Sequence, residues 1–314
     1  MPRILVDLHS HTTASDGQLT PTELVNRAEN RQVHLLAITD HDSIDGLAEA
    51  QQAISDCDFK LTLINGIEVT TNWLNHEIHV VGVNIDPASP SLIALITAQK
   101  EKRIERAIEM GRRLAKANIE GAYEGAKALA GEGNITRAHF ARYLVEKGVA
   151  PTFQKVFDKY LSRGNTGYVP HNWVDIDIAI NVILEAGGQA ILAHPNHYSL
   201  SNKWMRKLFT EFKALGGDAM EVAMGQQSPQ MRLQLEMWSN EYDLLASQGS
   251  DFHFVGPWRD VGKSLFLSER AIPIWATWPT YLQKVKSLEK IEALNSDKQI
   301  FEQIKNETTI KEES

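Results

Sequence analysis

Short apolar runs in this chain lead directly into histidine and acidic residues, and this pattern constrains the fold more than any other feature. Ile4–Leu8 is followed at once by His9 and His11, and Leu35–Thr39 is followed closely by His41. Because these runs are mostly apolar rather than alternating, they are typical of strands buried on both faces of a parallel sheet. We therefore expect an α/β fold whose strand ends carry side chains that can bind metal ions.

Further strand-like runs continue this pattern along the chain. Helix signals separate several of them: residues 20–23 form a capping box with proline at the first helical position, and Ser228 with Pro229 begins another helix in the same way. Repeated β-α units favour a parallel barrel or a doubly wound sheet. The further runs are Leu61–Val69, Ile78–Asn84, Gln189–Ala193, Ala219–Val222 and Leu244–Ser247.

The alternation breaks once, from about Ser91 to His171. This stretch has no convincing strand, and it is too long for a single crossover, so we interpret residues 91–171 as a helical insertion. The barrel is then discontinuous, with residues 1–90 and 172–285, and residues 286–314 form a charged tail whose last ten residues are expected to be frayed. Helices within the insertion are expected at Leu92–Lys116, Thr136–Lys147 and Thr152–Leu161.

Composition narrows the function classes. The formal net charge of −8 argues against binding nucleic acid by bulk electrostatics, so no stable DNA complex is expected, and local metal charge would have to attract a phosphate substrate. The single cysteine, Cys57, excludes an intrachain disulfide, and thiol-redox, zinc-finger and serine-hydrolase motifs are also missing. With no signal peptide or membrane span in the sequence, we expect a cytoplasmic protein without a membrane partner.

Two motifs near opposite ends of the chain have the spacing of metal ligands. Residues two apart on a strand face the same side, so His9 and His11 can reach one ion, and Asp251 with His253 repeats the arrangement. In a parallel barrel all such strand ends open on one face, where active sites lie. Imidazole nitrogens and carboxylate oxygens bind borderline and hard divalent metals, which points to metal-assisted hydrolysis. The candidate ligands are His9, His11, Asp16, His41, Glu68, His79, His194, Asp251 and His253.

The same motifs, taken together, resemble the polymerase-and-histidinol-phosphatase (PHP) family of metallophosphoesterases. The resemblance extends to about residue 270 and implies a distorted (β/α)7 barrel that holds three divalent metal ions. The acid at Asp16 is the pattern of one branch of the family, since other members have histidine there. The motifs that carry the resemblance are His9-x-His11, Thr39-Asp40-His41, Glu68, His194-Pro195 and Ser250-Asp251-x-His253.

The resemblance also implies how the ligands divide among the ions. With no thiolate and three carboxylates in the set, manganese or iron fits better than an all-zinc site, although zinc stays open. Glu68 would bridge two ions, so its replacement should remove the bridge. The first ion would be held by His9, His11, Glu68 and Asp251, the second by Glu68, His79 and His194, and the third by Asp16, His41 and His253.

Two segments of the insertion narrow the substrate. Ile135–Ala141 and Gly167–His171 resemble a PHP branch that removes the 3′-phosphate of nucleoside 3′,5′-bisphosphates and includes a 5′-to-3′ exoribonuclease. Arg137 is expected to bind phosphate bidentately, because guanidinium is planar and always charged. His139 and His171 are expected to bind phosphate or transfer a proton. The alternative for Arg137 is an ion pair with an acid on the insertion surface.

These features predict a hydrolase that acts on nucleotides or short 5′-phosphorylated RNA. Metal-bound hydroxide would attack phosphorus in line, while the ions and Arg137 neutralise the phosphoryl oxygens and His171 is a candidate acid for the leaving group. Glu68 is the residue on which turnover should depend. Two alternatives remain: a phosphatase of the histidinol-phosphate type, and a metal-stabilised binding module without turnover. The sequence does not predict the oligomeric state.

Overall fold

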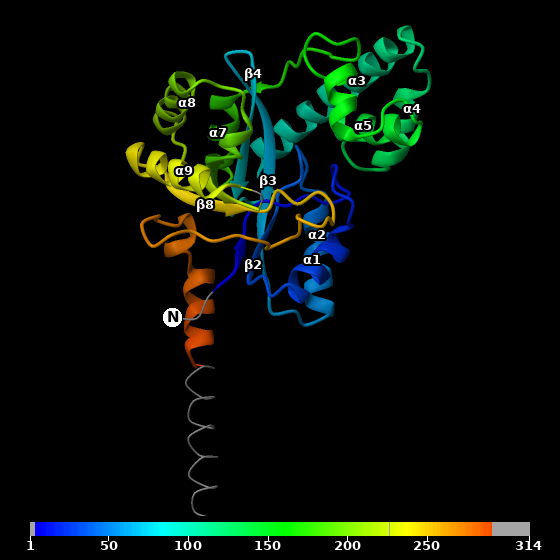
Figure 1. Cartoon of the computed structure of the whole chain (residues 1–314). Helices are drawn as coiled ribbons and strands as arrows, with labels where there is room; N and C mark the ends of the chain where they lie inside the picture. Colours follow the sequence, from blue (N-terminus) through cyan, green and yellow to red (C-terminus); the bar gives the residue numbers. More distant parts are fainter. Residues whose placement is uncertain (1–3, 226, 291–314) are drawn as a thin grey trace, which may run out of the picture.

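A computed structural model describes residues 4–225 and 227–290. The strands in these residues form a single twisted sheet, and helices pack around it (Figure 1). The backbone N–H of Leu8 donates to the carbonyl of Gln248 at 3.0 Å, and the N–H of His11 donates to the carbonyl of Phe252 at 2.9 Å. These bonds join the first and last strand segments and nearly close the expected α/β barrel. The strands follow the order β1 (Val6–Asp7), β2 (Leu35–Ile38), β3 (Thr62–Trp73), β4 (His76–Val83), β6 (Gln189–Leu192), β7 (Ala219–Met224) and β8 (Leu245–Gly249), with β5 (Val174–Asp175) paired to β3.

Helices cover the outside of the barrel, and apolar side chains fill its inside. Leu8, Leu35 and Ile191 are fully buried in an inner cluster that Trp275 and Trp278 complete. The predicted capping box begins α1, and the predicted serine-proline start begins α9. The covering helices are α1 (Pro21–Asn30), α2 (Gly46–Asp56), α7 (Ile176–Glu185), α8 (Asn202–Ala214) and α9 (Pro229–Glu241) (Figure 1).

Strand β4 departs from the parallel pattern that the sequence suggested. It pairs antiparallel with both β3 and β6. Only Leu74 and Asn75 separate it from β3, and both have positive φ, at 49° and 65°. A parallel neighbour would need a crossover of a dozen or more residues, so two residues in a hairpin turn leave the antiparallel arrangement as the only one.

The predicted helical insertion has its own hydrophobic core. Phe140, Leu144 and Leu161 are fully buried within it. The sequence missed α4, where Gly125 lowers the helix propensity of a nine-residue segment. The helices are α3 (Pro90–Lys116), α4 (Ala122–Ala130), α5 (Arg137–Glu146) and α6 (Phe153–Val156), and a π-helical turn, η1, spans Phe157–Leu161.

Helix α3 is attached to the barrel through a buried ion pair. Arg103 of α3 donates from Nε to Oδ2 of Asp42 at 2.8 Å and from Nη2 to the hydroxyl of Thr70 at 2.7 Å. Gln99, one turn earlier, donates to Asp42 Oδ1 at 3.2 Å. Because Asp42 directly succeeds His41 in the chain, this attachment fixes the insertion beside one of the candidate metal ligands.

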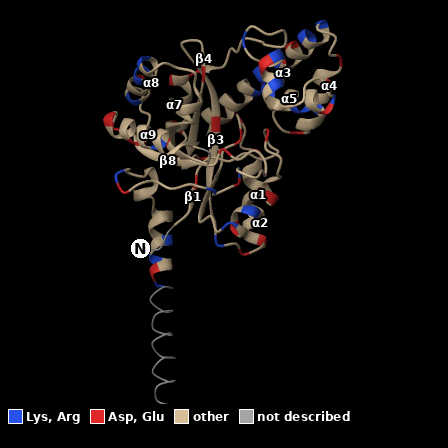
Figure 2. Cartoon of the chain, in the orientation of Figure 1, with Lys and Arg blue, Asp and Glu red and all other residues tan. Residues whose placement is uncertain are grey.

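The outer helices carry both signs of charge, as the mixture of blue and red segments in Figure 2 shows. Among residues 4–225 and 227–290, no helix is both long and apolar enough to cross a membrane. Residues 279–290 are helical, and residues 291–314, which include the end predicted to be frayed, lie outside the described residues.

Replacing Arg103 by alanine should destabilise the protein, because it leaves the Asp42 carboxylate buried without its partner. Removal of one member of a buried ion pair costs about 3–5 kcal/mol, which urea unfolding would measure. Arg112 lies on the same helix but pairs with Glu109 at the exposed surface. Arg112→Ala is therefore the matched control and should leave the urea concentration at the unfolding midpoint unchanged. Equal effects of the two substitutions would contradict this account.

Candidate metal centre

The structure brings all nine predicted ligands together at one end of the barrel. Each comes from a strand or from the segment after it, and Asp16 lies in the loop between β1 and α1. His9 and His11 follow β1, His41 follows β2, Glu68 lies within β3, His79 within β4, His194 follows β6, and Asp251 and His253 follow β8. The antiparallel hairpin therefore supplies two ligands from inside its strands, whereas the parallel strands supply theirs from their carboxyl ends.

The set assigned to the first ion is spaced for shared coordination. The Nε2 atoms of His9 and His11 lie 3.1 Å apart, and Asp251 Oδ1 lies 3.5 Å from the former and 3.3 Å from the latter. Glu68 lies beside them, with its Oε1 3.4 Å from His9 Nε2 and its Oε2 3.4 Å from His11 Nε2. Two ligands bound to one ion at 2.0–2.2 Å are at most about 4.4 Å apart, so His9, His11 and Asp251 can reach one ion together.

The set assigned to the second ion is equally close. Glu68 Oε1 lies 2.9 Å from His79 Nδ1 and 3.0 Å from His194 Nε2. The two imidazole nitrogens are 3.2 Å apart. Glu68 thus faces both groups of ligands, which is the position that a bridging carboxylate requires.

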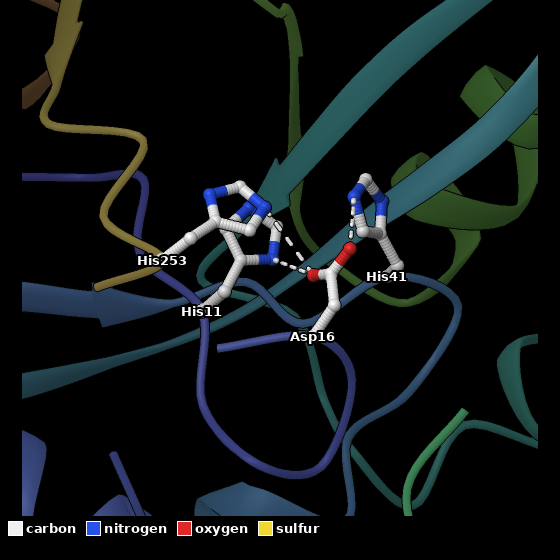
Figure 3. A group of neighbouring side chains, drawn as sticks. All are labelled: His11, Asp16, His41 and His253. Carbon is white, nitrogen blue, oxygen red and sulfur yellow. Dashed lines mark ion pairs between the residues drawn. The ribbon is translucent and has the colours of Figure 1, made fainter. Parts of the chain in front are cut away.

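Asp16 is the centre of the third group, which Figure 3 shows. Its Oδ1 lies 3.2 Å from His253 Nε2, and its Oδ2 lies 3.9 Å from His41 Nε2. His11 also approaches this group, because its Nδ1 is 3.9 Å from Asp16 Oδ1 while its Nε2 faces the first group. His41 likewise faces two ways, since its Nδ1 lies 2.9 Å from Glu68 Oε2.

The chemistry of these side chains fits divalent cations. His41 Nδ1 and Glu68 Oε2 are buried and lie 2.9 Å apart, yet neither atom makes a hydrogen bond. Buried polar atoms without partners are rare because they are costly, unless an ion or water satisfies them. A shared cation would satisfy both atoms. The assignment of each ligand to a particular ion remains a prediction.

The charges of the ligands also favour bound cations. Burial alone would raise the pKa of Glu68, but His41, His79 and His9 hold it well below its usual range. Glu68 in turn raises the pKa of His79 to about 10 against the effect of burial. The carboxylates therefore stay ionised and are stabilised by nearby positive charge. Bound metal ions would supply this charge in place of the protons on the surrounding imidazoles.

Glu221 of β7 is a functional residue that the sequence reasoning missed. Its Oε1 lies 2.7 Å from His9 Nδ1, and its Oε2 accepts the backbone N–H of His194 at 2.5 Å. A carboxylate on the second ring nitrogen orients a metal-binding histidine and fixes its tautomer. A signal was present, because Glu221 is a lone acid in a buried apolar strand, as Glu68 is in its own strand.

Backbone conformation around the centre is unusual. Asp42, His194 and Asp251 have positive φ angles of 47°, 28° and 48°. Such values are uncommon for residues other than glycine, and they cluster at functional sites. Gly249 is required nearby, since a Cβ at this position would lie 2.3 Å from that of His9 and 2.8 Å from Glu221 Oε1.

The insertion contributes side chains to the rim of the centre. The hydroxyl of Thr136 donates to Asp16 Oδ2 at 2.9 Å, which links the start of α5 to the third group. Arg137 pairs with Glu77 of β4, so the acid that it meets belongs to the barrel and not to the insertion surface. His139 is buried, and its Nδ1 accepts the backbone N–H of Thr136 at 3.1 Å, a local structural contact. Its expected contact with phosphate remains a prediction.

Two pockets lie beside Arg137 on the His79 side of the centre. The smaller has a volume of about 150 Å³ and is lined by Arg106 and Arg137 together with His41 and His79. The larger has a volume of about 430 Å³ and is lined by Arg137 and His171, with His79 again. Cationic side chains and candidate metal ligands thus share the same walls, which is the arrangement expected for a phosphate ester.

Comparison with known proteins agrees with this geometry. The sequence model of the PHP domain family matches residues 7–169. The chain belongs to the PHP family. It is 50% identical over 275 residues to the 5′-3′ exoribonuclease Rnm of Escherichia coli, an alignment that covers 88% of this chain and 94% of the relative.

Two further comparisons concern a curated relative and a solved structure. The chain is 42% identical to a 3′,5′-nucleoside bisphosphate phosphatase of Chromobacterium violaceum, with 86% of this chain and 95% of the relative covered. A crystal structure described as an amidohydrolase from Chromobacterium violaceum, with bound sulfate and no metal, superposes with a TM-score of 0.82 at 42% identity, covering 86% of this chain and 94% of that one. The fold predicted from the PHP resemblance is thereby confirmed.

Replacing Glu221 by glutamine should weaken metal binding without unfolding the PHP barrel, because His9 loses the carboxylate that orients it. Loss of such a partner typically lowers metal affinity or activity by about 10–100-fold. Calorimetric titration with Mn²⁺ would measure the affinity. Glu236→Gln is the matched control, since this buried acid of α9 bonds Ser268 instead and should leave metal affinity unchanged. Equal affinities for both variants would contradict the assigned role.

Proposed function

We propose that this chain is a metal-dependent phosphoesterase that removes the 3′-phosphate of nucleoside 3′,5′-bisphosphates and shortens 5′-phosphorylated RNA from its 5′ end. The observation that carries the proposal is the position of Arg137, whose side chain lines two pockets that also contain His79. A phosphate held by this guanidinium would lie beside the candidate metal ligands. The names of the two relatives support both activities.

Both reactions break the same bond, between phosphorus and the 3′-oxygen of the first nucleotide. Water attacks phosphorus in each, and the 3′-oxygen leaves and takes up a proton. From a bisphosphate the second product is inorganic phosphate, whereas from RNA the phosphate stays on the shortened chain as its new 5′ end. One centre can therefore serve both substrates, provided that it recognises the 5′-phosphate of the first nucleotide and accepts either a free 3′-phosphate or one that continues into an RNA chain.

We infer that three divalent ions, with manganese favoured, occupy the ligand groups around Glu68 and Asp16. When bound, such ions activate water and neutralise phosphoryl charge. The carboxylates and imidazoles named above would hold them, and Glu221 would keep His9 and His194 in position. Zinc and iron are the alternatives for the metal identity.

Arg137 and His171 are proposed to bind the 5′-phosphate. Arg137 stays charged and can donate two N–H groups to the phosphate. Part of its ion pair with Glu77 would then be replaced by these bonds to the phosphate. Burial, aided by nearby arginines that include Arg106, lowers the pKa of His171. A neutral imidazole at pH 7 suits a hydrogen bond to phosphate better than the role of leaving-group acid, so we favour the binding role for His171.

The alternative of a histidinol-phosphate phosphatase is disfavoured by the insertion, which adds cationic walls that a small monoester does not need. The alternative of a binding module without turnover is disfavoured by the centre itself, because a candidate ligand residue stands at each of the nine positions and neighbouring ligands form close groups. Each alternative predicts a different result from the proposed function in the hydrolysis assay described next.

The function can be tested with purified protein and added Mn²⁺. We expect phosphate release from a nucleoside 3′,5′-bisphosphate, and stepwise loss of 5′ nucleotides from a 5′-phosphorylated hexaribonucleotide. Glu68→Ala should reduce both rates to background, because it removes the carboxylate shared by two ligand groups. Faster hydrolysis of histidinol phosphate would support the first alternative, and full metal loading without turnover would support the second.

The role of Arg137 can be tested separately with Arg137→Met. Losing a hydrogen bond to a charged group costs about 1.5–3 kcal/mol, so kcat/KM for the bisphosphate should fall about 10–150-fold. A nucleoside 3′-monophosphate lacks the 5′-phosphate, and its hydrolysis should fall much less. Arg112→Met, at the exposed surface of α3, serves as the control. An equal fall for both substrates would show that Arg137 does not recognise the 5′-phosphate.

A further inference from the structure

A further cavity lies on the Asp251 and His253 side of the metal centre and shares Asp16 with the smaller Arg137 pocket. Its volume is about 730 Å³, and its lining includes the ligands Asp16, Asp251 and His253. The pocket that Arg137 and His41 share is only about 150 Å³, which is below the roughly 300–1,000 Å³ of sites that hold drug-sized ligands. The cavity of about 730 Å³ also exceeds the second Arg137 pocket, at about 430 Å³, so it offers more room for nucleosides than either Arg137 pocket.

Aromatic side chains line this cavity and face solvent. Trp258 is 75% exposed, Phe153 is 39% exposed and Phe254 is 38% exposed. Large exposed aromatic groups that gather at one cavity mark a binding surface. Phe254 is covalently adjacent to the ligand His253, so the surface begins at the metal centre itself.

Cations are interleaved with these rings. The Arg259 guanidinium lies over the Phe254 ring, with its central carbon 5.5 Å from the ring centroid, and Lys263 approaches Trp258 at 6.0 Å. Arg142 lines the cavity from the insertion side. Aromatic faces that alternate with positive charge are the features that bind single-stranded nucleic acid, in which bases stack and phosphates pair with cations.

We propose that this cavity, named the aromatic groove and defined by Phe153, Phe254, Trp258, Arg142 and Arg259, binds the RNA nucleotides on the 3′ side of the scissile phosphate. The proposal rests on the proposed function, because it concerns the path of the RNA chain. The cationic pockets receive the terminal 5′-phosphate, and the aromatic groove receives the remainder of the strand. The direction of degradation then follows from this arrangement, since the cationic pockets hold the chain end and the roomier groove holds the continuing strand.

The aromatic groove should matter for RNA more than for mononucleotides. Loss of one base stack weakens binding by about five- to 150-fold. Trp258→Ala should therefore lower the ratio of kcat/KM for a 5′-phosphorylated hexaribonucleotide to that for a nucleoside 3′,5′-bisphosphate by this factor. Trp258→Tyr keeps a stacking surface and should restore most of the ratio. Trp204→Ala, which removes a 40%-exposed tryptophan of α8, is the matched control and should leave the ratio unchanged.

Length dependence gives a second readout. The wild-type kcat/KM should rise as the RNA grows from two to four nucleotides, and Trp258→Ala should abolish most of that rise. An unchanged ratio, or an equal fall for both substrates, would overturn the proposal. So would a dimer, seen by sedimentation velocity, that Trp258→Ala dissociates without changing the ratio, because the groove would then bind a second copy of the chain.

A failure of the proposed function would be distinguishable from a failure of this inference. If the wild-type protein hydrolysed neither substrate, the proposed function would fail. The groove could still be tested by fluorescence anisotropy of a 5′-phosphorylated, 3′-fluorescein hexaribonucleotide with chelator-treated protein. Weaker binding by Trp258→Ala but not by Trp204→Ala would support the groove, and equal binding by all three proteins would overturn it.

Discussion

The carboxylate of Glu68 is fully buried, and the arrangement of the centre depends on how its charge is balanced. Five imidazoles lie around its two oxygens, from His9, His11, His41, His79 and His194. A buried carboxylate without compensating charge is strongly destabilising. The negative charge of Glu68 therefore favours both the close approach of these imidazoles and the binding of cations. The segments that carry the ligands must then meet at one end of the barrel.

The scaffold meets this demand through specific local features. The β3–β4 hairpin sets Glu68 and His79 on neighbouring strands, where Thr70 pairs in register with His79. Gly249 leaves the space in which His9 meets Glu221. Glu68, His79 and Glu221 lie within strands, so their positions are determined before any ion binds, which favours tight and selective coordination.

In the proposed function, the insertion makes a general hydrolytic centre selective. The buried pair between Arg103 and Asp42 fixes α3 next to His41, and Thr136 bonds the carboxylate of Asp16. Arg137 is thereby placed on one side of the centre, while Arg142 of the same helix faces the aromatic groove on the other. One short helix can thus contribute to recognition of a 5′-phosphate and to the path of the strand beyond it.

Local patterns in the sequence predicted much of this protein. The capping box at Thr20, the apolar runs of the parallel strands and the two-residue spacing of His9 and His11 are encoded within a few residues, so they can be read without the fold. Resemblance to the PHP family then added the barrel and the grouping of ligands. Helix α4 was missed because its glycine and its flanking glycines weaken the local signal.

The remaining features depended on distances between residues far apart in the chain. Glu221 supports His9 across 212 positions, and Arg137 meets Glu77 across 60 positions. The aromatic groove joins Phe153 of the insertion to Trp258 of a barrel loop. The sequence by itself determined the chemistry of the ligands and the elements that carry them, because these depend on residue type and short-range periodicity. Only the tertiary structure decided that Glu221 meets His9 and which side chains line each pocket beside the centre, because both depend on how separate strands and the insertion pack together.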